Sequence, residues 1–145
     1  MEKSFSAHAA PGTIRAILID PVELTITEGW QTTGLKALYE TLGCDCIDIR
    51  GIGVDPKGNP VDMICDDNGR LIDGQRCFRM GSEIFAGRVL LVSHDDEGET
   101  TASGLPLHDV GRVVQWCAPE TDYTPLPMVV TSFESFDEIA KYLGG

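Results

Sequence analysis

The first part of the chain alternates between apolar runs and short polar breaks, as expected for strands joined by tight turns. Residues 13–21 (TIRAILIDP) form a nearly continuous apolar run rich in β-branched residues, which predicts a buried central strand. Residues 23–28 (ELTITE) alternate between polar and apolar positions, which predicts the returning strand of a hairpin. Asp20 and Pro21 lie between the two runs and favour a turn, because proline presets the backbone angle there.

A helix and a third strand are expected to follow this hairpin. In residues 32–43 (TTGLKALYETLG), leucines recur at helical spacing, and the final glycine is a typical helix stop. Residues 44–53 (CDCIDIRGIG) alternate, with Ile47 and Ile49 on one face, which predicts a strand. The chain is therefore expected to open with a β-β-α-β order of elements.

The middle of the chain predicts further strands around one that is fully buried. Residues 61–72 predict a hairpin, with Asn68-Gly69 as a type I′ turn. Residues 88–94 (RVLLVSH) are apolar on both faces, which predicts a central strand of the sheet. Residues 99–103 (ETTAS) are expected to pair back onto that strand. Between these segments only one short strand is expected, near residues 77–79.

Two more helices and one strand are expected toward the C-terminus. Residues 106–117 carry apolar side chains at helical spacing, residues 128–133 predict a strand, and residues 135–145 predict a helix that begins with a capping box. The pattern predicts a single compact α+β domain over residues 13–145, with a mixed, mostly antiparallel sheet packed by about three helices. Residues 1–12 are expected to form a flexible N-terminal tail.

The composition is that of a globular chain with a strong acidic excess. The formal net charge is −12, so the long-range field opposes direct binding to nucleic acid and suits a basic protein partner. No run approaches the roughly 20 apolar residues of a membrane span, and the first residues lack the apolar stretch of a secretory signal. The five cysteines, an odd number, indicate free thiols in a reducing compartment. We therefore expect a cytoplasmic protein.

The densest group of polar side chains follows the predicted central strand. Its potential metal ligands are His94, Asp95, Asp96, Glu97 and Glu99. A calcium-binding loop with Gly98 at its sixth position needs an acidic residue at its twelfth, where the sequence has Gly104. That template fails, and dense carboxylates beside a glycine are typical of a solvated hairpin tip. We therefore predict a hairpin tip within an acidic contact surface, with a metal-dependent enzyme centred on His94 as an alternative.

Two further candidates lie outside this segment. Trp30, just before the predicted helix, is a candidate anchor for a partner, although a tryptophan there more often packs onto the core. Arg76, Arg79 and Arg88 are candidates for a pocket that binds an anionic ligand. The sequence contains neither a G-x-S-x-G elbow nor a phosphate-binding glycine motif, and its C-x-C pair lacks further ligands at zinc spacing. No catalytic residue, cofactor or resident metal is predicted.

Several blocks of the sequence together resemble a known family. These blocks are IRAILIDP…LTITE, LYETLGCDCIDI, VDMICDDNGRLI and FAGRVLLVSHDDEGETTASGLPLHDV. Their order is similar to that of domain-of-unknown-function family 3846, over residues 13–116. The family comprises small proteins common in bacteriophages, plasmids and their hosts. The resemblance implies a protein of a mobile element in the cytosol of a bacterial host, and it implies no reaction.

These observations predict a non-enzymatic accessory binding protein of a phage or other mobile element. It is expected to inhibit or modulate a host protein, such as a basic or nucleic-acid-binding defence factor, through an acidic surface. A protein that sequesters a nucleotide immune signal through its arginines is the second alternative. The sequence leaves the oligomeric state open.

Overall fold

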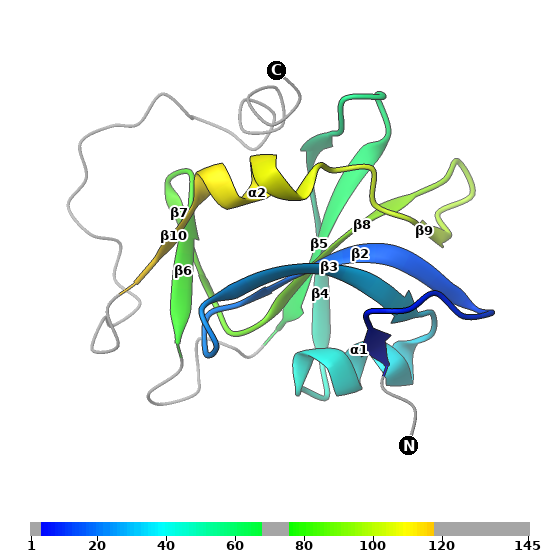
Figure 1. The fold of residues 1–145 in the computed structure, drawn as a ribbon, viewed down its shortest axis with the longest axis horizontal. Helices are drawn as coiled ribbons and strands as arrows, with labels where there is room; N and C mark the ends of the chain where they lie inside the picture. The colour runs from blue at the N-terminus through cyan, green and yellow to red at the C-terminus, as the bar shows by residue number, and fades with distance from the viewer. Residues whose placement is uncertain (1–3, 68–75, 118–145) are drawn as a thin grey trace.

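The computed structural model describes residues 4–67 and 76–117, which form two antiparallel sheets and two short helices (Figure 1). The strands are β1 (Phe5–Ser6), β2 (Thr13–Asp20), β3 (Thr25–Thr32), β4 (Ile47–Val54), β5 (Pro60–Asp66), β6 (Cys77–Met80), β7 (Glu83–Ala86), β8 (Val89–His94), β9 (Thr100–Thr101) and β10 (Val114–Trp116). The helices are α1 (Leu35–Leu42) and α2 (Leu107–Val113). No helix among these described residues is long and apolar enough to cross a membrane.

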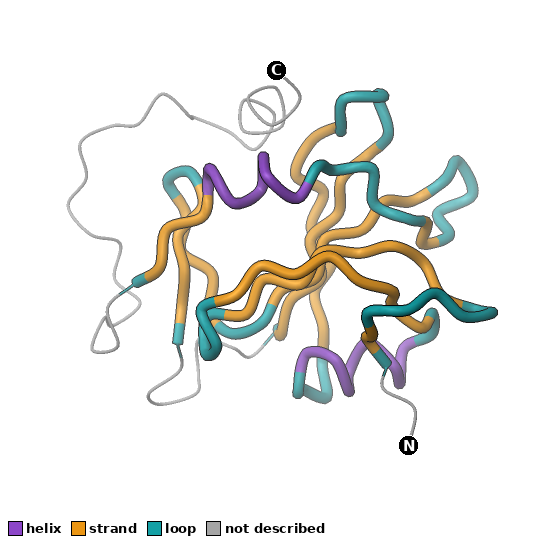
Figure 2. The backbone as a smooth tube through the Cα atoms, viewed as in Figure 1, coloured by secondary structure: helices purple, strands orange, loops and turns teal. Residues whose placement is uncertain are grey.

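The predicted α+β domain, with a mixed sheet packed by three helices, is wrong. Strands make up 49% of the described residues and helices 14%, and Figure 2 shows the two helices as short segments beside long strands. Every strand pairing among the described residues is antiparallel. The described chain is therefore mainly β, because segments expected to be helical or irregular pair as strands instead.

The larger sheet is centred on β8. Its strands follow the order β1-β3-β2-β8-β5-β4, and β9 pairs with the end of β8. Leu91 of β8 lies opposite Ile17 of β2 on one side and opposite Met63 of β5 on the other. A strand between two neighbours, with apolar side chains on both faces, needs a cover over each face. The prediction of a central strand over residues 88–94 is confirmed.

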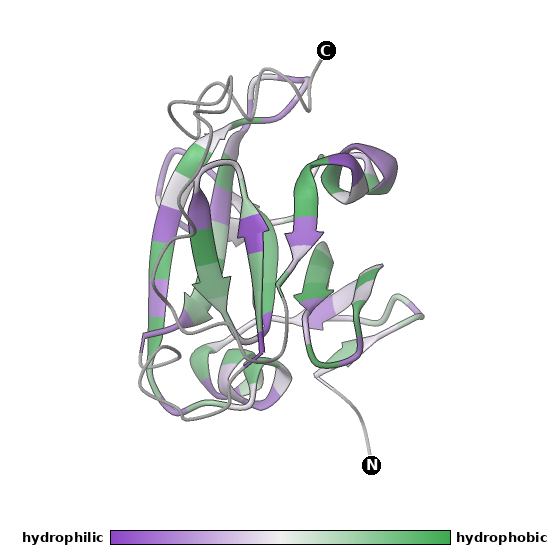
Figure 3. Ribbon diagram, turned by 90° about the vertical axis from the view of Figure 1, so that its left-hand side faces the viewer, coloured by the Kyte–Doolittle hydropathy of each residue, from purple (hydrophilic) through white to green (hydrophobic). Residues whose placement is uncertain are grey.

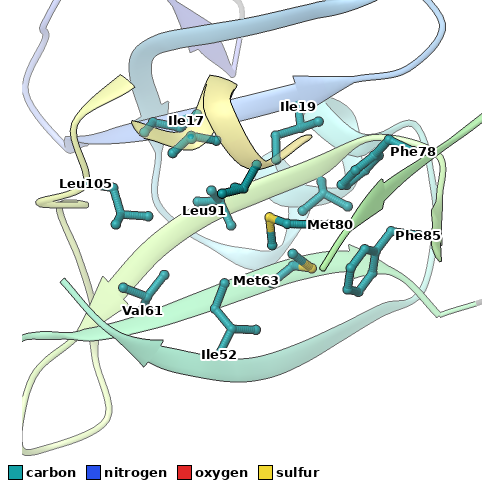
Figure 4. Close-up of a cluster of buried hydrophobic side chains, with 13 residues drawn as sticks. Ile17, Ile19, Ile52, Val61, Met63, Phe78, Met80, Phe85, Leu91 and Leu105 are labelled. Carbon is teal, nitrogen blue, oxygen red and sulfur yellow. The ribbon is translucent and has the colours of Figure 1, made fainter. Parts of the chain in front are cut away.

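Each face of the larger sheet has its own hydrophobic core. On one face, Leu38 and Leu42 of α1 pack in a cluster with Leu90 and Val92 of β8. On the other face, the smaller sheet and α2 cover the alternate side chains of the same strands, and Figure 4 shows this cluster around Met63. In Figure 1, α1 lies below the larger sheet and α2 above it. Figure 3 shows that the strands carry both hydrophobic and hydrophilic residues.

The smaller sheet has the strand order β10-β6-β7, and most of it was not predicted from the sequence. Only the strand near residues 77–79 was predicted. Phe78 of β6 and Phe85 of β7 are opposite in register, and their ring centroids are 5.5 Å apart. The ring of Trp116 on β10 meets Phe78 edge-on, at 6.4 Å. Short strands of this kind are stabilised mainly by such contacts, so their own sequences carry little periodic signal.

The helix expected over residues 106–117 is shorter than predicted. α2 ends at Val113, and the chain continues directly as β10, where Val114 lies opposite Met80 of β6. Gly111 and the consecutive pair Val113-Val114 weaken a helix at this point. Pairing with β6 satisfies the same backbone groups in a strand, so the C-terminal half of the predicted helix is replaced by β10.

The N-terminal segment is not a tail throughout its described part. Phe5 and Ser6, within residues 1–12, form β1 and pair with β3. The ring of Phe5 lies over Gly29, where an added methyl group would come within 2.6 Å of the ring. Part of the expected tail therefore belongs to the larger sheet.

The opening hairpin and the helix after it are confirmed, with one difference in β4. β2 and β3 pair from Thr13↔Thr32 to Asp20↔Thr25, and Gly43, with φ of 69°, ends α1. Ile47 and Ile49 lie on one face of β4 as predicted, but Ile49 is 54% exposed because β4 is an edge strand that α1 does not fully cover.

Three predicted features lie outside the described residues. They are the turn at residues 68–69, the strand at 128–133 and the helix at 135–145.

Candidate acidic contact site

The β8–β9 turn projects from one end of the larger sheet and contains the acidic segment. The backbone N–H of Asp95 donates to the Glu99 carbonyl at 3.0 Å, and the N–H of Gly98 donates to the Asp95 carbonyl at 3.0 Å. Asp95 Oδ1 also accepts from the backbone N–H groups of Glu97 and Glu99, each at 3.0 Å. Gly98 has φ of 84°, a conformation that favours glycine. The predicted hairpin tip is therefore confirmed, and Asp95 is the residue that shapes it.

The other acids of this turn have no such role. Asp96, Glu97 and Glu99 are exposed. In the part of the chain that the structure describes, their carboxylates make no hydrogen bond or ion pair. Three negative side chains thus face solvent at the tip, close enough to repel one another.

The β4–β5 turn has the same hydrogen-bonded skeleton. The N–H of Asp55 donates to the Asn59 carbonyl at 2.8 Å, and the N–H of Gly58 donates to the Asp55 carbonyl at 2.9 Å. Asp55 Oδ1 accepts from the N–H groups of Lys57 and Asn59, at 2.9 and 3.0 Å. Gly58 has φ of 86°. The two five-residue turns, DPKGN and DDEGE, therefore share their first and fourth residues and differ in the other three.

The two turns lie at the same end of the larger sheet. β5 begins where β8 ends, because the two strands are antiparallel and Asp62 lies opposite Val92. Ser93 Oγ donates to the Pro60 carbonyl at 2.5 Å, which ties the ends of the two strands together. In Figure 1 both turns extend away from the smaller sheet.

A histidine–aspartate pair stands at the base of the acidic turn. His94 Nδ1 lies 2.6 Å from Asp62 Oδ2. Asp62 is only 7% exposed, while the His94 side chain is 40% exposed. The sequence predictions included His94 and missed Asp62. The available signal was a lone carboxylate inside an apolar strand, since a buried carboxylate needs a partner.

Asp55 was also missed, and its environment is unlike that of Asp95. Asp55 is 4% exposed, and its Oδ2 has no hydrogen-bond partner among the described residues. This oxygen lies directly against Gly104, where an added methyl group would overlap it. The β4–β5 turn is thus packed against the segment that leads into α2, whereas the β8–β9 turn is free.

Trp30 is placed differently from its prediction. It lies within β3, opposite Arg15 of β2 and Ser6 of β1, and it is partly buried. It is therefore part of the sheet rather than of a loop before α1.

The three candidate arginines are engaged in separate places. The Arg79 guanidinium donates to the Gln115 side chain on β10. Arg88 Nε donates to Asp20 Oδ2 at 3.1 Å. Arg76 lies just before β6, and its carbonyl accepts from the Gly87 N–H at 2.9 Å. The contacts of the described residues do not bring these arginines into one anion-binding pocket.

Thiols and acids gather at the opposite end of β4 and β5. Burial, and after it the charge of Asp48, raises the pKa of the Cys65 thiol to about 11, so this thiol is a poor nucleophile at neutral pH. A hollow of about 260 Å³ opens between this end and β7, and its charged lining consists of Asp48, Arg50, Asp66, Asp67 and Glu83. All five cysteines are free, as predicted.

No group of three or more potential metal ligands is arranged to hold a metal ion in the described ranges 4–67 and 76–117. His94 pairs with Asp62, and Asp95 directs Oδ1 into its own turn.

The described residues thus form two antiparallel sheets with an acidic hairpin tip at one end of the larger sheet. The chain belongs to the family described as Domain of unknown function (DUF3846), whose family model matches residues 14–107. The match includes both turns and the His94–Asp62 pair, and it ends at Leu107 rather than at residue 116. No curated protein and no solved structure matches the chain.

Proposed function

We propose that this protein is a non-enzymatic binding protein that contacts a basic partner protein through the β8–β9 tip. In the mobile-element setting that the family resemblance suggests, the partner is a host protein such as a defence factor with a basic or nucleic-acid-binding groove. The tip inserts its exposed carboxylates, Asp96, Glu97 and Glu99, into that groove. Binding excludes the partner's own ligand by steric and electrostatic competition.

The observation that carries this proposal is the comparison of the two turns. The β4–β5 turn forms the same hydrogen bonds with Pro56, Lys57 and Asn59 where the β8–β9 turn has three acids. The skeleton therefore requires only the aspartate and the glycine. Three adjacent carboxylates in an exposed turn repel one another, so the fold gains nothing from them. We attribute their presence to a contact outside the fold.

The electrostatics of the whole chain support the same partner class. A net charge of −12 attracts a basic surface over a distance of about one Debye length and speeds its approach. The tip then concentrates three of these charges on a projecting turn. The His94–Asp62 pair and the Ser93–Pro60 hydrogen bond hold the base of the turn in place.

The test replaces the acidic turn with its neighbour's sequence. The variant Asp96→Pro, Glu97→Lys, Glu99→Asn keeps the first and fourth residues and converts DDEGE into DPKGN. Tagged wild type and variant are used to capture proteins from host lysate, and bound proteins are quantified by mass spectrometry. We expect a basic partner that wild type retains, that the variant loses at least about tenfold, and that about 0.5 M salt releases.

A matched control separates the tip from total charge. The variant Glu23→Lys, Asp45→Lys changes the formal charge by the same amount at the other end of the sheet, because each replacement of an acid by lysine adds two positive units, and it leaves the charged lining of the hollow unchanged. It should retain the partner. Equal loss with both variants contradicts a specific tip, and retention by the swapped turn contradicts the proposal.

A further inference from the structure

The outer edge of β4 is open in the described structure. β4 ends the strand order of the larger sheet and pairs there with β5 alone. Its sequence, IDIRGIGV, has neither the lysine nor the proline that commonly protects an edge strand. A register shift between Gly51 and Gly53 disturbs its second half. Residues 47–51 keep a regular register with β5, and no other strand among the described residues pairs with their outer side.

The two faces of this edge differ in chemistry. Ile49 lies opposite Ile64 on the α1 side of the sheet, where its side chain is 54% exposed. Asp48 lies opposite Cys65 on the other side, beside the hollow of about 260 Å³. An added strand places alternate side chains on the two faces. It would therefore meet an apolar surface on one face and carboxylates on the other.

The described residues that line the hollow include four acids and one arginine. Arg50 Nη1 lies 2.7 Å from Glu83 Oε2, and its guanidinium carbon lies 5.5 Å from the centroid of the Phe85 ring. The positive charge of Arg50 therefore offsets the negative charge of Glu83. Asp48, Asp66 and Asp67 also line the hollow, so its net charge favours cationic side chains.

We propose that the β4 edge binds an extended segment of a partner protein in which basic and apolar residues alternate. The segment adds as a seventh strand along the main path of the larger sheet, bonded to the backbone of residues 47–51. Its apolar side chains cover Ile49, and its lysine or arginine side chains reach the carboxylates around Asp48. Main-chain hydrogen bonds supply affinity and the alternating side chains supply selectivity, as in other cases of strand addition. A second copy of this chain fits less well, because two chains of charge −12 repel each other.

The experiment uses a fluorescent, end-capped octapeptide of alternating lysine and valine, titrated with the full chain and followed by anisotropy. The control peptide has the same sequence with every backbone nitrogen methylated, which keeps charge and side chains and removes the hydrogen-bond donors. We expect saturable binding of the first peptide and at least about tenfold weaker binding of the second. Equal binding of the two would overturn the proposal, because attraction would then depend on charge alone.

Protein variants locate the binding. Ile49→Lys adds a positive charge to the β4 edge, and Val22→Lys adds the same charge at a site of similar exposure, 49%, in the β2–β3 turn. We expect Ile49→Lys to weaken peptide binding at least about tenfold and Val22→Lys to leave it nearly unchanged. Equal effects of the two lysines would contradict an edge-specific site.

Amide hydrogen exchange identifies the strand directly. Peptide binding should slow the exchange of outward-facing amides in residues 47–51 and leave the β8–β9 turn unchanged. If these amides are already protected in the free chain, the edge is occupied and the proposal fails. Because the tip variant leaves β4 intact, failure here and failure of the tip proposal are separate results.

Discussion

The two hairpin turns at one end of the larger sheet are the same structure in two environments. Asp55 and Asp95 each accept two backbone N–H groups through one carboxylate oxygen, and a glycine with φ near 85° closes each turn. Asp55 is buried against Gly104, whereas Asp95 is exposed. The same hydrogen bonds therefore form in one turn that is packed against the rest of the fold and in another turn that is exposed to solvent.

The difference between the turns separates what the fold needs from what it permits. An aspartate at the first position and a glycine at the fourth are common to both. The remaining three positions are proline, lysine and asparagine in one turn and three acids in the other. The substitutions below test each part of this comparison by its effect on the free energy of unfolding, beginning with the largest.

Gly104→Ala should have the largest effect. The added methyl group overlaps Asp55 Oδ2, and that carboxylate is held in place by the N–H groups of Lys57 and Asn59. Overpacking of this kind costs about 3 kcal/mol. Urea unfolding measures the loss.

Gly111→Ala is the matched control for that substitution. The same methyl group in α2 meets no atom within 4 Å, and alanine favours a helix over glycine by about 1 kcal/mol. The control should stabilise the chain. A loss at Gly104 no larger than the change at Gly111 contradicts the close packing of the buried turn.

Removal of the turn aspartates comes next. Asp55→Ala and Asp95→Ala each leave two backbone N–H groups without their carboxylate acceptor. We expect a loss of about 2 kcal/mol for Asp55 and about 1 kcal/mol for Asp95, since water replaces the acceptor more easily in the exposed turn. Unfolding curves for both variants give the order. A larger loss for Asp95→Ala than for Asp55→Ala would show that burial does not set the contribution of the aspartate to stability.

Much of this fold was predictable because the larger sheet is built from elements with strong local patterns. The run at residues 13–21, the alternation after it and the doubly apolar run at 88–94 each predicted a strand that the structure contains. Such segments bury long, regular faces, so their periodicity survives in the sequence. The same holds for the leucine spacing of α1.

The smaller sheet and the end of α2 were not predictable in this way. β7 and β10 have four and three residues, too few for a periodic signal, and their pairing with β6 depends on contacts across the fold. Val114 therefore continues a helical pattern in sequence and forms a strand in space. Tertiary contacts override weak local preference here.

The candidate site was likewise predictable only where its residues form a local pattern. The acidic tip at Asp96 and Glu97 is visible as a run of charges beside a glycine. Asp62 was missed because its pairing with His94 depends on strand register, which the sequence does not display. The resemblance of the two turns was missed because DPKGN, with its mixed charges, attracted no functional interpretation.

The turn glycines should have equal effects. Gly58 and Gly98 have φ of 86° and 84°, and an added methyl group meets no atom within 4 Å at either position. The cost of alanine is therefore backbone strain alone, about 1 kcal/mol in each turn. Thermal and urea unfolding of the two variants should agree within about 0.5 kcal/mol. A clear difference would mean that the two skeletons are not equivalent.

The swap of DDEGE for DPKGN should have the smallest effect on stability. It leaves Asp95 and Gly98 in place and changes the formal charge from −12 to −8, because two acids become neutral and one becomes lysine. Loss of repulsion between the tip carboxylates offsets any loss of local fit, so the free energy of unfolding should change by less than about 0.5 kcal/mol. The free energy of unfolding should depend less on salt concentration in the variant than in wild type. Only wild type has three adjacent charges whose repulsion is screened by salt. Urea unfolding at about 0.05 and 0.5 M salt measures both quantities. A large loss of stability would show that the acids stabilise the fold. Loss of the partner by the swapped variant would then follow from unfolding and would contradict a direct contact through these acids.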